Sequence, residues 1–158
     1  MSNLITIDEL LDHIDQGELS QVAGIGSHNS SEGRALDTDK IDAAIKFASD
    51  MVRGYMLRRF PVISTLQAEQ SPELIKGYVA DIVRHRLRSR TGNRNTTSDE
   101  TTQRFEDART WLKEVSRGLI NVDFGEEPVG SANTTNPMGT VRSVTPDKRA
   151  SKILNGYH

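Results

Sequence analysis

The chain has 158 residues and a formal net charge of −2, with 35% hydrophobic and 27% charged residues. That length suits one compact domain with a modest core, and the near-neutral charge argues against a dedicated nucleic-acid-binding domain, which is usually basic. The absence of cysteine excludes disulfides, thiolate catalysis and cysteine-ligated zinc, and is typical of proteins made in a reducing cytoplasm. We expect no signal peptide and no membrane span, because basic and long apolar runs of those kinds are absent.

A short helix is expected first. Thr6 and Glu9 have the spacing of a capping box, apolar residues follow at helical spacing, and Gly17 is expected to end the helix. Residues 24–33 are rich in Gly, Ser, Asn and His, and therefore predict a loop.

The second predicted helix starts at Thr38 as its N-cap and stops near Phe60, because Pro61 disfavours a helical residue before it. Its apolar residues form one stripe with the 3.6-residue period, whereas Leu57 lies off that stripe and suggests a second, lesser contact face. The stripe comprises Ile41, Ala44, Ile45, Ala48, Val52, Tyr55 and Met56.

A third helix is predicted from the segment Ser71-Pro72-Glu73, which supplies an N-cap, a proline at the first position and an acid in the first turn. Its apolar residues cover well over half the circumference, which predicts a central helix packed on more than one side. The fourth helix is expected to open at Thr97-Ser98-Asp99-Glu100 and to end at Gly118. Residues 119–124 alternate apolar and polar and predict a short extended segment.

Residues 125–158 are rich in Gly, Ser, Thr, Asn and Pro and show no period. We therefore predict an all-α fold: a small bundle of about four helices in residues 1–124, followed by an extended or disordered C-terminal tail in residues 125–158 that orders on partners. Extended chain of that length reaches about 110 Å at about 3.3 Å per residue, well beyond its own subunit.

Little in the chain predicts enzyme chemistry. The four histidines lie on separate elements without the spacing of a helical metal site, and neither a phosphate-binding loop nor a nucleophile elbow is present. We therefore expect no catalytic residues, no metal, no cofactor and no enzyme activity.

One charge cluster invites two interpretations. Arginines stand at 84, 86, 88 and 90, more than helix capping needs. They could contact phosphates, but the interpretation we favour is structural or intersubunit pairing, with Asp81 as a local partner of Arg84 and with Arg58 and Arg59 close by. The residues assigned to this ring or ion-pair surface are Arg58, Arg59, Asp81, Arg84 and Arg88.

Three segments together resemble a known family. They are Gly54-Tyr55-Met56 with Arg59-Phe60-Pro61, then Asp81-Ile82-Val83-Arg84-His85-Arg86-Leu87, and Arg104-Phe105-Glu106-Asp107-Ala108 running into Trp111-Leu112 and Gly118. In order and spacing the chain resembles the Mu-like phage and prophage connector proteins, small helical subunits akin to the head–tail adaptors of long-tailed phages. The resemblance covers roughly residues 5–124, and Phe60, His85 and Phe105 stand where tyrosines are common in the family.

The resemblance implies a virion protein of the neck, assembled in the host cytoplasm as a ring of identical subunits, expected to be a dodecamer. The ring would dock beneath the portal protein, hold a stopper or tail-terminator protein below, and let DNA pass without sequence-specific binding. On this interpretation the tail would bind the portal or a neighbouring subunit through Arg142, Val144, Lys148, Arg149, Lys152, Ile153, Leu154 and Tyr157.

The alternative is a DNA-binding or DNA-packaging accessory protein that uses the basic end of the third helix. It predicts salt-sensitive DNA binding that is lost when the arginines at 84, 86, 88 and 90 are replaced by alanine.

Overall fold

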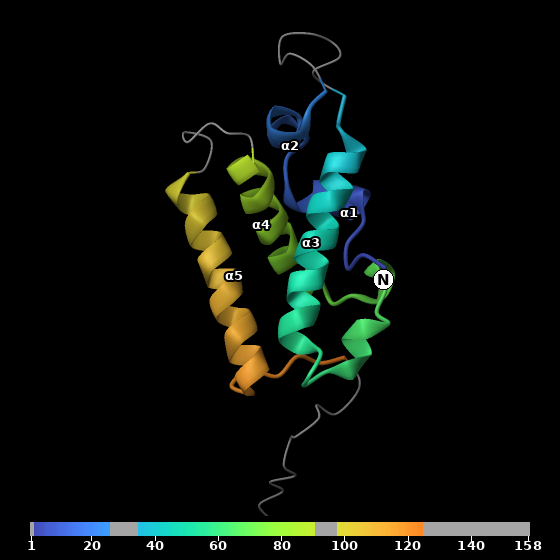
Figure 1. Cartoon of the computed structure of the whole chain (residues 1–158), viewed down its shortest axis with the longest axis vertical. Helices are drawn as coiled ribbons and strands as arrows, with labels where there is room; N and C mark the ends of the chain where they lie inside the picture. The colour runs from blue at the N-terminus through green and yellow to red at the C-terminus, as the bar shows by residue number, and fades with distance from the viewer. Residues whose placement is uncertain (1, 26–34, 91–97, 125–158) are drawn as a thin grey trace, which may run out of the picture.

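The computed structural model describes residues 2–25, 35–90 and 98–124, and this described part contains helices and no β-strand. The elements are α1 (Ile7–His13), α2 (Gln16–Ala23), α3 (Thr38–Met56), the 3-10 turns η2 (Pro61–Ser64) and η3 (Ala68–Gln70), α4 (Glu73–Arg90) and α5 (Asp99–Arg117). Figure 1 shows α3, α4 and α5 running along the long axis, with α1 and α2 packed at one end. The predicted all-α bundle is confirmed.

The N-terminal region holds two short helices where one was expected. The capping box of α1 is present: the Glu9 N–H donates to Thr6 Oγ1 at 3.2 Å, and the Thr6 N–H donates to Glu9 Oε2 at 2.9 Å. The chain then turns extended at Ile14, and Asp15 caps α2 by accepting from the Gly17 N–H at 2.8 Å. The prediction that Gly17 ends the first helix was wrong, because that glycine lies in the first turn of α2.

Helix α3 starts one residue away from the expected cap. Asp37, rather than Thr38, is the N-cap, and its carboxylate accepts from the Lys40 N–H at 3.0 Å. The predicted apolar stripe faces the core, and the helix stops before Phe60 as expected. Pro61 then opens the turn η2.

Helix α4 is the central element, as its wide apolar surface predicted. It contacts α1, α2, α3 and α5. It begins at Glu73, and the expected cap residue Ser71 belongs to the end of η3, where its backbone N–H donates to the Ala68 carbonyl.

Helix α5 begins and ends where predicted. The Ser98 hydroxyl accepts from the Thr101 N–H, and Gly118 adopts the left-handed conformation with φ of 83°. Residues 119–124 form no strand but cross the lower end of the bundle, where the Phe124 ring lies 5.2 Å from that of Phe60 (Figure 1). The predicted tail, residues 125–158, lies outside the described residues, so the boundary at residue 124 remains a prediction.

Two buried cations hold the N-terminal segment on the bundle. Arg53 is only 5% exposed and donates to the carbonyls of Ile63 at 3.0 Å, Ser2 at 2.5 Å and Leu66 at 3.2 Å. Lys76 of α4 lies 2.5 Å from Glu9 of α1, and this bond keeps the pKa of the Glu9 carboxyl below its usual value. The position of α1, and through it of α2, therefore depends on side chains from α3 and α4.

Candidate functional site

The basic end of α4 is built around one carboxylate. Glu18 of α2 places Oε1 3.0 Å from Nε of Arg84 and 2.8 Å from Nη2 of Arg88. Arg84 also donates to the His13 carbonyl at 3.0 Å. These two arginines therefore bind α2 and the end of α1 to α4, inside the subunit.

Asp81 joins the same network from one turn earlier. Its Oδ1 lies 3.4 Å from Arg84, the local partner that the sequence predicted, and 3.9 Å from Arg104 of α5. Burial raises the pKa of the Asp81 carboxyl, while Arg104 and Arg84 act in the opposite direction. The network thus connects three helices through a half-buried acid.

The remaining arginines of the basic stretch differ in their surroundings. The guanidinium of Arg86 lies 3.5 Å from the centre of the Phe47 ring, a cation–π contact that joins α4 to α3. Arg90, in contrast, is exposed at the end of α4. Three of the four arginines therefore have partners within the subunit, which limits how freely the stretch could follow a phosphate backbone.

Arg58 and Arg59 are not part of this network, so the prediction that they lie close to it was wrong. They follow the C-terminus of α3, and α4 runs back along α3, so that its basic end is at the opposite end of the bundle (Figure 1). Arg59 donates to Asn121 Oδ1 at 2.5 Å and packs against Gly118, whereas Arg58 is exposed.

The tail residues assigned to partner binding lie outside the described residues, as do His28 and His158. The tail residues are Arg142, Val144, Lys148, Arg149, Lys152, Ile153, Leu154 and Tyr157. Their role in binding remains a prediction.

Stacked rings hold α5 against α4. The rings of Tyr78 and Trp111 lie 4.4 Å apart, and those of His85 and Phe105 lie 4.1 Å apart and nearly parallel. Partial burial lowers the pKa of His85, although Glu106 acts to raise it. Two of the three positions at which the resemblance implied a tyrosine, 85 and 105, thus contact each other directly.

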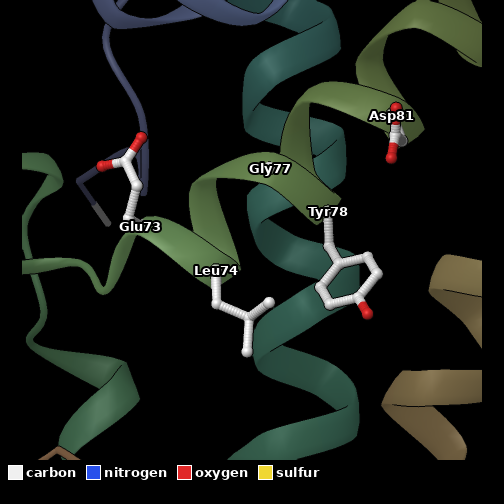
Figure 2. A pocket seen from close by; sticks show the side chains of 5 residues that line it. All are labelled: Glu73, Leu74, Gly77, Tyr78 and Asp81. Atoms are coloured by element: carbon white, nitrogen blue, oxygen red, sulfur yellow. The ribbon is translucent and has the colours of Figure 1, made fainter.

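One side of α4 remains uncovered by its neighbours. An open groove of about 430 Å³ runs along the helix, lined by Leu74, Gly77 and Tyr78 with Glu73 and Asp81 at its ends. Figure 2 shows these side chains on one side of α4, with α3 passing behind the helix. Leu74 is 55% exposed, which is unusual for a leucine on the central helix.

A second hollow lies on α3. It measures about 280 Å³ and is lined by Asp50, Arg53, Gly54, Leu57 and Ser64. Leu57, which the sequence placed off the buried stripe, is 45% exposed at its edge. The sequence marked Leu57 but missed the α4 groove, because periodicity does not reveal which side of a central helix its neighbours leave open.

Among the described residues, no group of three or more histidine or acidic side chains is arranged to hold a metal ion. Within the same residues, no helix is both long and apolar enough to cross a bilayer.

Comparison with protein families gives one result for this chain. The model of the family described as Bacteriophage Mu, Gp36 matches residues 5–140, which covers the whole described helical part and continues beyond residue 124. No curated protein and no solved structure is detectably similar to the chain.

Proposed function

The chain belongs to the bacteriophage Mu Gp36 family, and on that premise we propose that this phage protein is a head–tail connector (adaptor) subunit. In this role identical subunits form a ring, expected to be a dodecamer, beneath the portal protein. The ring links the capsid to a stopper or tail-terminator protein, and DNA passes through its channel without sequence-specific binding. The protein would act as a structural component of the virion, and not as an enzyme, after assembly in the host cytoplasm.

The family match carries this proposal. It spans the helical part from residue 5 and agrees with the resemblance of the three helical segments to phage connectors. Exposed leucines on α3 and α4 support it further, because a ring subunit must present apolar surface to its neighbours.

The arginines favour this proposal over a DNA-packaging accessory role. Arg84 and Arg88 share Glu18, and Arg86 lies on Phe47, so these three guanidinium groups already have partners within the subunit. A nucleic-acid-binding surface would instead present unpaired cations to phosphate groups.

The two functions predict different lysates from a phage that carries an early stop codon in this gene. A missing connector should leave DNA-filled heads and free tails that fail to join. A missing packaging accessory should leave empty heads. Electron microscopy of the lysate, with wild-type protein supplied from a plasmid as the control, distinguishes the two, and empty heads would contradict the connector proposal.

The tail has a separate test. Deleting residues 126–158 should leave a folded helical domain but weaken binding to the portal, as measured by co-sedimentation. Unchanged portal binding would show that the tail residues do not contact the portal.

A further inference from the structure

Two glycines lie within long helices, Gly54 in the last turn of α3 and Gly77 in the second turn of α4, and no contact within the subunit requires them. A Cβ atom built on Gly54 of α3, or on Gly77 of α4, would meet no atom within 4 Å. Alanine would therefore fit at both positions, and it stabilises a helix interior relative to glycine. Packing within the subunit does not explain why both positions are glycine, whereas close approach of another molecule would.

Each glycine has an exposed leucine three residues away. At the end of α3 the leucine follows the glycine, with Gly54 in the last turn and Leu57 as the C-cap residue, which keeps helical backbone geometry. In α4 the leucine precedes the glycine, as Leu74 and Gly77. The leucines are 45% and 55% exposed, and each borders the hollow that the glycine opens. Each helix therefore carries one apolar projection and one recess, in opposite order along the chain.

The two sets of residues face in different directions. On α3 the glycine and the leucine lie off the buried stripe that packs on the core. On α4 they face the viewer in Figure 2, with α3 behind the helix. One subunit therefore presents two different apolar surfaces, as a head-to-tail contact between identical subunits requires, and such contacts close into rings.

We propose that the Gly54–Leu57 surface of one copy of the chain packs on the Leu74–Gly77 surface of the next. If the two helices run roughly parallel, Leu57 covers Gly77 of the neighbour while Leu74 covers Gly54. The register is matched, because three residues advance both helices by the same distance, about 4.5 Å. This proposal rests on the proposed function and supplies the lateral contact of the ring.

Charge supports a contact between the two surfaces, because the α4 groove has an acid at each end. Arg58 is exposed and directly follows Leu57, while Asp81 lies at the end of the α4 groove beyond Gly77. In the parallel arrangement the guanidinium approaches the neighbour's Asp81 end of the groove. The antiparallel arrangement would also bring Arg58 to an acid, Glu73, so charge does not choose between the two directions. It would place leucine against leucine and glycine against glycine, so that neither leucine would cover a glycine.

Cysteine cross-linking can test the contact, because the chain has no cysteine of its own. Phage particles would be prepared with Leu57→Cys and Gly77→Cys together, which meet in the parallel arrangement, and with each substitution alone. Leu57→Cys shortens the side chain that covers Gly77 of the neighbour, which leaves room for Gly77→Cys. After mild oxidation, denaturing electrophoresis should show a ladder of linked subunits from the double variant and none from either single variant. A double variant with Leu57→Cys and Leu119→Cys is the matched control, since Leu119 is 73% exposed but lies outside both surfaces.

Each other outcome overturns a distinct statement. Dimers from Gly77→Cys alone would show that like surfaces meet, and would contradict the head-to-tail contact. Particles that contain the chain but give no ladder would contradict the contact while leaving the connector function standing. Absence of the wild-type chain from particles would overturn the connector function and the contact together.

A glycine substitution gives a second, independent readout. Gly77→Ala should raise the thermal unfolding midpoint of the isolated subunit and reduce its incorporation into particles several-fold in competition with the wild-type chain. Ser116→Ala, at an exposed position of α5, is the control and should leave incorporation unchanged. Full incorporation of Gly77→Ala would overturn the close approach at this glycine.

Discussion

Arg53 and the pair Arg84 and Arg88 perform similar tasks in different surroundings. Arg53 is buried and joins the N-terminus to η2 and to the loop before η3 through three backbone carbonyls. Arg84 and Arg88 share one carboxylate near the surface, where water can replace lost partners. The comparison teaches that burial, rather than the number of arginines in a cluster, decides how much of the fold depends on them.

The largest effect is expected from Arg53→Met. The substitution leaves carbonyls in the interior without donors, and the free energy of unfolding should fall by about 3 kcal/mol. Urea denaturation followed by circular dichroism measures the loss. Arg90→Met, at an exposed arginine, is the control and should change stability by less than about 0.5 kcal/mol. Equal small effects at both positions would contradict the comparison.

Gly118→Ala should have the next largest effect and lower the free energy of unfolding by about 2 kcal/mol. An L side chain is strained at the φ of 83°, and the new Cβ would also collide with the Arg59 guanidinium. Adding Arg59→Ala removes the collision and should recover part of the loss, which a double-variant cycle can measure. If Arg59→Ala does not reduce the loss in free energy of unfolding, the Arg59 side chain moves aside at no measurable energetic cost.

Glu18→Gln tests how much the less buried ion pairs of Arg84 and Arg88 contribute to stability. Arg84 and Arg88 lose their shared charge, and stability should fall by about 1 kcal/mol at low salt and by less in 1 M salt, where ion pairs are screened. Denaturation at the two ionic strengths tests this. A loss as large as that of Arg53→Met, and independent of salt, would contradict the distinction between the two regions.

The smallest effect concerns pH. Because burial lowers the pKa of His85 in the folded state, the unfolded chain binds the proton more strongly. The stability that this residue contributes is therefore present above its unfolded pKa of about 6.5 and is lost as the pH falls through the lower folded pKa. His85→Phe, which can still stack on Phe105, should reduce the drop in unfolding midpoint between pH 8 and pH 5. If the decrease in unfolding midpoint between pH 8 and pH 5 is unchanged in the variant, groups other than His85 cause it.

The sequence predicted the helices better than their mutual arrangement. Local signals at Thr6, Ser98 and Gly118 act within one turn, so helix starts and ends could be found from spacing alone. Helix α2 was missed because only one residue, Ile14, separates the end of α1 from the α2 cap, Asp15. The arrangement needs tertiary packing: nothing near Arg53 in the chain shows that its guanidinium is buried.

The candidate surfaces show the same limit. Leu57 could be found because it lies off a clear stripe, whereas the α4 groove depends on which side of the helix α1, α3 and α5 leave open. The segment of Arg58 and Arg59 was predicted to lie near the basic stretch at residues 84–90 because both segments carry several arginines. The chain reverses direction between α3 and α4, and this places the two segments at opposite ends of the bundle.

The measurement that tests the connector proposal most directly is the mass, by light scattering, of the purified full chain before and after mixing with the portal protein of its phage. The proposal predicts that the chain joins the portal in a near one-to-one ratio of subunits. A chain that ignores the portal but shifts in mass with duplex DNA would contradict it and favour the packaging accessory instead.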